Sequence, residues 1–206
     1  MADEFVVPSM VCIVEGDGED AAIRSLVRRV VTDIDPSKYV DVSHIIRVPR
    51  NKVVGPGQLE RDIELAARRL TRPGAIFVLL DSEDACPAVL GPELLKRARQ
   101  QCNGIPISVV LANREYEAWF LAAAESLRTH PKIDPDFPLR TTLPESPRDA
   151  KGQVGSMMRS RTYSARSDQA SLTEHFDLTM ARSADSFDKC YRDLTGLVSH
   201  LLPVEK

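Results

Sequence analysis

The sequence has few cysteines, no long apolar run and only a small net charge, and each of these features excludes a class of protein. Its 206 residues include four cysteines without a C-x-x-C pair, which argues against a disulfide framework or a zinc site. No apolar run approaches the roughly 20 residues of a transmembrane helix, so we expect no membrane span. A net charge of −3 excludes a general polybasic nucleic-acid binder but permits local basic patches.

The composition that remains is typical of a globular protein with a substantial core. Hydrophobic residues make up 43% of the chain and charged residues 28%. The first four residues, Met-Ala-Asp-Glu, are acidic and lack the basic start of a signal peptide. We therefore expect a cytoplasmic protein with reduced cysteines.

Strand-like and helix-like segments alternate along the first two thirds of the chain. Apolar, β-branched stretches occupy residues 5–14, 39–48, 75–80 and 105–111. Helical spacing of apolar residues follows at 22–34, 58–70, 90–102 and 114–125, with a loop at 49–56. This alternation predicts an α/β fold: a Rossmann-like, mostly parallel sheet flanked by helices.

The pattern changes after Arg128. Five prolines fall between Pro131 and Pro147, which excludes a regular element of useful length there. The chain then becomes helical and ends in a clear apolar stripe over 186–202. We predict an α/β core at residues 1–128 and, at 129–206, a Pro-rich connection and a C-terminal helical extension packed on that core.

Carboxylates follow three of the predicted strands: Glu15 after the first, Asp81, Glu83 and Asp84 after the third, Glu115 and Glu117 after the fourth. In open α/β sheets the functional groups lie just beyond the carboxyl ends of the strands. If the third strand stays extended, Asp81 and Glu83 point the same way. Clustered carboxylates repel unless a cation lies between them, and Mg²⁺ or Mn²⁺ takes such oxygen ligands. The pattern indicates a metal site for phosphoryl transfer, with Glu15 moving a proton.

Two other interpretations of these acids remain open. Glu19, Asp20, Glu115 and Glu117 also fit the first turns of helices, where the helix dipole favours acids. Residues 16–21 match the dinucleotide-binding pattern G-x-G-x-x-A. Four acids in and beside that loop would repel a pyrophosphate, which disfavours a nucleotide cofactor.

In order along the chain, these residues resemble a Toprim-type domain, which pairs a first-strand glutamate with a later D-x-D. The closest resemblance is to the uncharacterised Toprim-like proteins numbered 4276 among domains of unknown function. The matching pieces are Val14-Glu15-Gly16 with Glu19, residues 79–87, residues 115–122, Lys151 with Tyr163, and Ser186-Phe187.

The resemblance implies roles for the acids. Glu15 would be the acid/base residue, Asp81 would join it in the catalytic centre, and Asp81 and Glu83 would hold Mg²⁺. The second acid of the motif is glutamate here rather than aspartate, so Asp84 is an alternative ligand. The full set of metal candidates is Glu15, Asp81, Glu83, Asp84 and Glu115, with Glu117 as further support.

Basic residues provide candidate phosphate contacts. Lys151, Arg159 and Arg161 lie in the helical extension, and Arg47, Arg50 and Lys52 form a second group. Solvated surface cations are the alternative interpretation of each group. Trp119, at helical spacing with Tyr116 and Phe120, is expected in the core rather than as a base-stacking platform.

The expected function is a Mg²⁺-dependent nuclease or phosphodiesterase acting on nucleic acid. The resemblance further implies an AAA-type or related ATPase partner in prokaryotic anti-phage defence. Docking of that ATPase, or of a second copy of the chain, is expected on the extension. The alternatives are a non-catalytic Toprim-like module that binds such an ATPase, and a nucleotide-cofactor protein of Rossmann type.

Overall fold

The computed structural model describes residues 7–71, 73–139 and 143–202, apart from the side chain of Asp17. The first half of the described chain alternates strands and helices: β1 (Ser9–Val14), α1 (Asp17–Ile34), β2 (Asp41–Arg47), α2 (Arg50–Val54), α3 (Gln58–Arg69), β3 (Gly74–Asp81), α4 (Pro87–Gln101) and β4 (Ile107–Ala112). The rest is helical: α5 (Ala118–Ala122), the 3₁₀ helix η1 (Ala124–Thr129), α6 (Ala150–Met157), the π-helical turn η2 (Ala165–Gln169), α7 (Ala170–His175), α8 (Leu178–Ala181) and α9 (Asp185–Leu201).

The four strands form one parallel sheet in the order β2-β1-β3-β4. Val14 at the end of β1 pairs with Leu79 of β3, and Asp81 at the end of β3 pairs with Ala112 of β4. The carboxyl ends of these central strands therefore meet at one edge of the sheet. The predicted α/β fold, with a parallel sheet between helices and further helices at the C-terminal end, is confirmed.

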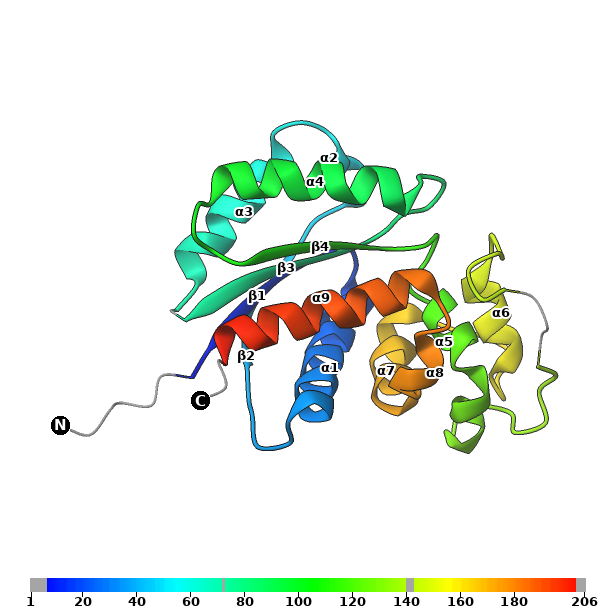
Figure 1. The fold of residues 1–206 in the computed structure, drawn as a ribbon. Helices are drawn as coiled ribbons and strands as arrows, with labels where there is room; N and C mark the ends of the chain where they lie inside the picture. Colours follow the sequence, from blue (N-terminus) through cyan, green and yellow to red (C-terminus); the bar gives the residue numbers. More distant parts are fainter. Residues whose placement is uncertain (1–6, 72, 140–142, 203–206) are drawn as a thin grey trace.

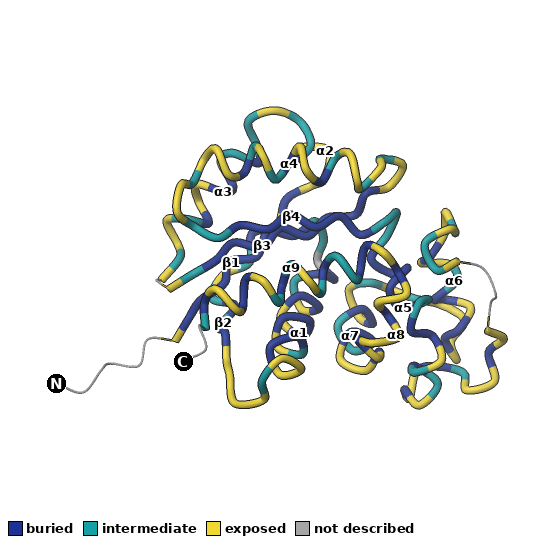
Figure 2. Tube along the Cα trace, viewed as in Figure 1, coloured by how far each residue is buried: buried dark blue, intermediate teal, exposed yellow. Residues whose placement is uncertain are grey.

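Helices cover both faces of the sheet (Figure 1): α2, α3 and α4 on one face, α1 and α9 on the other. Alternate strand residues supply the two cores, with Cys12 and Phe77 facing α1 and α9, and Ile13 and Val78 facing α3 and α4. The strands are buried along their whole length except in β2, whereas the outer helix surfaces are exposed (Figure 2).

The helical extension shares its core with the sheet. One cluster of buried side chains runs from Met10 in β1 through Trp119 in α5 to Leu201 in α9. Trp119 is fully buried, as expected, and its indole N–H donates to the hydroxyl of Ser186 at 2.8 Å. The helices α5 to α8 lie beyond the carboxyl ends of the strands, so they border the predicted site (Figure 1).

Three predicted boundaries are wrong. The expected loop at 49–56 contains the short helix α2, whose first turn follows Pro49. The helix α4 begins at Pro87 rather than at 90, because proline is favourable in a first helical turn. The predicted helix at 114–125 is interrupted: Arg114 has a left-handed φ of 64°, α5 begins only at Ala118, and η1 continues the chain as a 3₁₀ helix.

Candidate active site

Four carboxylates converge at the carboxyl edge of the sheet, and we call them the acid cluster: Glu15, Glu19, Asp81 and Glu117. Glu15 directly follows β1, and Asp81 is the last residue of β3. Glu19 lies in the first turn of α1, and Glu117 immediately precedes α5. Glu15 and Glu117 each raise the pKa of both Glu19 and Asp81, which shows that the four share one environment.

The side chain of Asp81 is fixed by its neighbours. Only 8% of the residue is exposed, and its Oδ1 accepts a hydrogen bond of 2.8 Å from the backbone N–H of Tyr116. Its Oδ2 lies 3.8 Å from Nζ of Lys151. The carboxylate therefore has one oxygen anchored to the chain after β4 and the other facing the centre of the site.

Lys151, from α6 in the helical extension, brings a cation to the acid cluster. Its Nζ lies 3.8 Å from Asp81, 3.6 Å from Glu115 and 3.9 Å from Glu117. Its backbone N–H donates to Oε2 of Glu115 at 3.0 Å, which fixes the start of α6 against the loop after β4. The site is thus built by two parts of the chain that are distant in sequence.

Two carboxylate oxygens of the cluster are buried without a hydrogen-bond partner among the described residues: Oε2 of Glu15 and Oε2 of Glu117. Glu117 is completely buried, and its other oxygen accepts a 2.8 Å hydrogen bond from the hydroxyl of Tyr163. Buried charged oxygens without donors are costly for a folded protein. They indicate that the cluster lacks some of the positive charge or hydrogen-bond donors that it is built to receive.

The pKa values of all four cluster acids are raised, and burial is the largest cause in each case. Mutual repulsion adds to this effect: Glu19 and Glu117 both raise the pKa of Asp81. Burial alone would lower the pKa of Lys151, but Glu117, Asp81 and the other carboxylates outweigh it, so its pKa is raised. The ammonium group therefore stays charged and offsets part of the negative charge.

Glu83 borders the acid cluster, because its charge raises the pKa of Glu15, whereas the exposed Asp84 lies outside it. The strand β3 ends at Asp81, and Glu83 has a left-handed φ of 51°, so strand geometry does not align Glu83 with Asp81. The Glu83 carboxylate pairs with Arg50 at 3.1 Å. The Asp84 carboxylate is 79% exposed and is paired with two arginines, Arg114 at 3.7 Å and Arg148 at 3.4 Å.

Arg50 holds the turn that follows β3. Its guanidinium donates to the backbone carbonyls of Asp81 at 2.8 Å and Ser82 at 2.6 Å, as well as to Glu83. The sequence placed Arg50 only in a basic surface group. Its inward orientation was missed because nothing near it in sequence identifies the turn that it contacts.

Arg159 and Arg161 lie on the segment after α6. Arg161 is engaged with Asp134 at 3.0 Å and with the carbonyl of Ser156 at 2.7 Å. Arg159 donates through Nε to the carbonyl of Pro131 at 3.1 Å and has no carboxylate partner within the described chain. Of the three predicted phosphate contacts, Lys151 lies beside the acid cluster, Arg161 is paired with Asp134, and Arg159 has no carboxylate partner among the described residues.

The glycine loop after β1 is occupied by the protein itself. The Glu19 carboxylate accepts from the backbone N–H of Gly16 and so closes the loop as a helix cap. A Cβ at Gly18 would lie 2.7 Å from the carbonyl oxygen of Ala165 in η2, so this glycine permits close packing of α1 on the extension. Both features disfavour a pyrophosphate site at this loop.

The acid cluster offers donors suited to a divalent cation. Mg²⁺ and Mn²⁺ prefer carboxylate oxygens, and two such oxygens here lack a hydrogen-bond partner in the part of the chain that the structure describes. Within 7–71, 73–139 and 143–202, however, no three His, Cys, Asp or Glu side chains form a ready-made metal site. The donor chemistry therefore fits the ion, and the carboxylates need to draw closer to share it.

Asp81→Asn is expected to stabilise the metal-free protein at neutral pH. Burial raises the pKa of Asp81, so its contribution to stability is present at low pH and is lost as the pH rises through the folded pKa. Each unit of difference between the folded and unfolded pKa corresponds to about 1.4 kcal/mol, or roughly 3–6 °C in Tm for a domain of this size. Thermal unfolding in chelator, from about pH 4 to about pH 8, measures the gain, which should vanish at the acidic end.

Asp188→Asn is the control for this experiment. Hydrogen bonds from Arg182 and Arg192 lower the pKa of Asp188, so this substitution should destabilise the protein at neutral pH. Equal Tm values for wild type and Asp81→Asn at every pH would show that burial of the ionised Asp81 carboxylate does not destabilise the folded protein.

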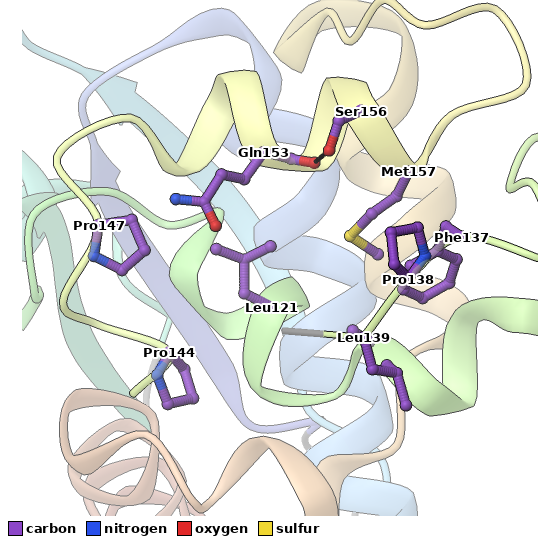
Figure 3. A pocket seen from close by; sticks show the side chains of 10 residues that line it. Leu121, Phe137, Pro138, Leu139, Pro144, Pro147, Gln153, Ser156 and Met157 are labelled. Carbon is purple, nitrogen blue, oxygen red and sulfur yellow. Dashed lines mark hydrogen bonds between the residues drawn. The ribbon is translucent and has the colours of Figure 1, made fainter. Parts of the chain in front are cut away.

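A separate pocket beneath α6 has a different character (Figure 3). None of its lining side chains is ionisable: Leu121, Ala124, Phe137, Pro138, Leu139, Pro144, Pro147, Gln153, Ser156 and Met157. Without a titratable group this pocket offers no acid–base chemistry.

No helix within the described ranges combines the length and the hydrophobicity that crossing a bilayer requires. Comparison of the chain with protein-family models, with curated proteins and with solved structures finds no match to any of them. The acid cluster is therefore the feature of the described chain that points to a function.

Proposed function

We propose that this protein is a Mg²⁺- or Mn²⁺-dependent phosphodiesterase that cleaves nucleic acid, with Glu15 as its general acid or base. The observation that carries the proposal is the convergence of Glu15, Asp81 and Glu117 at the carboxyl edge of a parallel sheet, with two buried oxygens left without donors among the described residues. Such an edge is where open α/β folds perform their chemistry.

The roles follow from the surroundings of each residue. Burial raises the pKa of Glu15 toward neutral pH, and a pKa near the working pH suits a group that must both accept and release a proton. The backbone of Tyr116 fixes the orientation of Asp81, and Tyr163 fixes that of Glu117. Lys151 stands where it can contact a phosphate oxygen while it restrains the carboxylates.

The residues that would hold the metal ion are Glu15, Asp81 and Glu117. When bound, a divalent cation supplies positive charge that offsets the charge developing on phosphoryl oxygens. We leave Glu83 and Asp84 out of this ligand set because both are paired with arginines. We leave out Glu115 because Lys151 occupies both of its oxygens, one through Nζ at 3.6 Å and the other through its backbone N–H.

Mg²⁺ or Mn²⁺ is expected to raise the Tm of the wild type, because an ion that binds only the folded acid cluster stabilises it. At a concentration about 100 times its Kd the gain is about 2.7 kcal/mol, or roughly 5–10 °C. Asp81→Asn should abolish the shift, whereas Glu64→Gln, an exposed acid on α3, should retain it. A Tm that neither ion changes in the wild type would contradict the metal site.

A non-catalytic binding module is the second candidate, and the position of Lys151 favours it. With its ammonium near three carboxylates, the cluster is partly neutralised by the protein itself. Incubation of the protein with labelled DNA and RNA and Mn²⁺ distinguishes the two. Cleavage supports the enzyme, and its absence even with the partner present supports the module.

A partner ATPase, in a cytoplasmic prokaryotic defence system, completes the proposal through the resemblance to Toprim-like proteins. The Pro-rich connection offers apolar side chains that no core requires: Leu139 is 49% exposed and Leu143 is 78% exposed. Exposed apolar groups of this kind commonly mark interaction surfaces. They are the residues at which docking of the ATPase, or of a second copy of the chain, is best tested.

A further inference from the structure

A groove of about 490 Å³ lies on the helical extension, and Tyr163 in its lining contacts Glu117 of the acid cluster. Two segments line it: residues 131–132 and the stretch from 158 to 168 that leads from α6 into η2. An isolated antiparallel bridge between Ile133 and Met158 holds the two segments together. The groove is thus a formed feature of the extension.

The lining of the groove is suited to phosphate. Four hydroxyl groups and two cations line it: Ser160, Thr162, Ser164, Ser167, Lys132 and Arg159. Hydroxyl, lysine and arginine side chains are the usual contacts of a nucleic-acid backbone. The acid among the lining residues, Asp168, is buried and bound by Lys132 at 2.6 Å, so the charge of Arg159 is left in excess.

Tyr163 connects this groove to the acid cluster. Its side chain lines the groove, while its hydroxyl donates to Oε1 of Glu117 at 2.8 Å. The two sites therefore share one aromatic wall. Aromatic side chains in positively charged grooves stack the bases of single-stranded nucleic acids without strong sequence preference.

We infer that this groove binds a single strand of nucleic acid, with its phosphates on Arg159 and the hydroxyl groups and one base against Tyr163, and so delivers the next phosphodiester to the acid cluster. The inference rests on the proposed function for the destination of the strand. The volume lies within the roughly 300–1,000 Å³ of small-molecule sites, which suits a nucleotide unit and is too small for a duplex.

The test measures binding by the full-length chain, separately from cleavage. Fluorescence anisotropy of short labelled oligothymidylate and oligouridylate, in chelator to prevent cleavage, gives Kd over a series of salt concentrations. Arg159→Ala should weaken binding and reduce the salt slope by about 0.7, the value for each phosphate that a protein neutralises on a single strand. Arg99→Ala, at a likewise exposed arginine on α4, is the matched control and should change neither quantity.

The aromatic wall has its own pair of variants. Tyr163→Leu should weaken binding about tenfold through loss of stacking, whereas Tyr163→Phe, which keeps the ring, should bind like the wild type. Three results would overturn the inference. The wild type binds neither oligonucleotide, or it binds a duplex as tightly as a single strand, or the variants Arg159→Ala and Tyr163→Leu both bind as tightly as the wild type.

The outcomes separate this inference from the proposed function. If the protein cleaves nucleic acid but neither Arg159→Ala nor Tyr163→Leu weakens binding, the groove is not the strand-binding site, and the proposed enzyme function still holds. Binding that depends on both residues, without cleavage in Mn²⁺ and with the partner present, would retain the groove and reject the enzyme. A stronger response for oligouridylate than for oligothymidylate would identify RNA as the preferred strand.

Discussion

Glu15→Gln is expected to lower the rate of nucleic-acid cleavage by about 10²–10⁴-fold, the usual contribution of a general acid or base. Glutamine keeps the size of the side chain but cannot exchange a proton near neutral pH. The substitution also removes a carboxylate whose Oε2 is buried without a donor from the described residues, so we expect no loss of stability. The measurement is single-turnover cleavage of a labelled strand in saturating Mn²⁺, with the partner ATPase and its nucleotide present.

Glu83→Gln is the matched control for this experiment. Glu83 follows the same edge of the sheet, but its carboxylate is 61% exposed and paired with Arg50. We expect a much smaller decrease in rate, while oligonucleotide binding stays close to wild type in both variants. If Glu15→Gln cleaves as fast as the wild type, Glu15 is not the proton-transfer group.

Ending the chain after Leu127 is expected to prevent folding. The deletion would remove side chains from the buried cluster that the extension shares with the sheet and α1: Val154, Met157, Leu172, Phe176, Phe187, Leu194, Val198 and Leu201. Each such side chain contributes about 1.5–3 kcal/mol when fully buried. Their combined loss, about 12–24 kcal/mol, matches or exceeds the roughly 5–15 kcal/mol that stabilises a typical domain.

Far-UV circular dichroism and limited proteolysis of the shortened chain measure this outcome. A cooperative unfolding transition in the shortened chain would show that residues 1–127 fold independently. Because we expect none, docking of the ATPase is tested on the intact chain with Leu143→Ser, at a side chain that is 78% exposed. This variant should unfold like the wild type, and its loss of co-purification would locate the docking surface.

Three strands of the sheet, β1, β3 and β4, were predictable because their sequences are almost entirely apolar. A strand that is buried on both faces appears in the sequence as an unbroken apolar run, and the first charged residue after the run marks the end of the strand. Glu15 and Asp81 were identified for this reason, and the topology then places both at one edge. The short helix α2 was missed because five residues give too little periodicity to distinguish a helix from a loop.

Local sequence patterns could not predict which residues contact these acids. Lys151 lies 36 residues after Glu115, across a Pro-rich connection whose path depends on tertiary packing. Glu83 fits the acidic motif in sequence, yet the left-handed turn at that residue directs it to Arg50. Glu19 fitted the first turn of a helix, where the dipole favours acids, and from that turn it also caps α1 at Gly16. Its place in the acid cluster depends on tertiary packing.

The late position of α9 in the chain has a consequence for synthesis on the ribosome. The four cluster acids all emerge within the first 117 residues, whereas Lys151 and Tyr163 follow later, and α9, which packs on β4, follows both of them. Because domains fold as units once their parts are available, a nascent chain carries the acids without the scaffold that aligns them. The geometry that the proposed activity requires is therefore assembled only after α6, η2 and α9 have been synthesised.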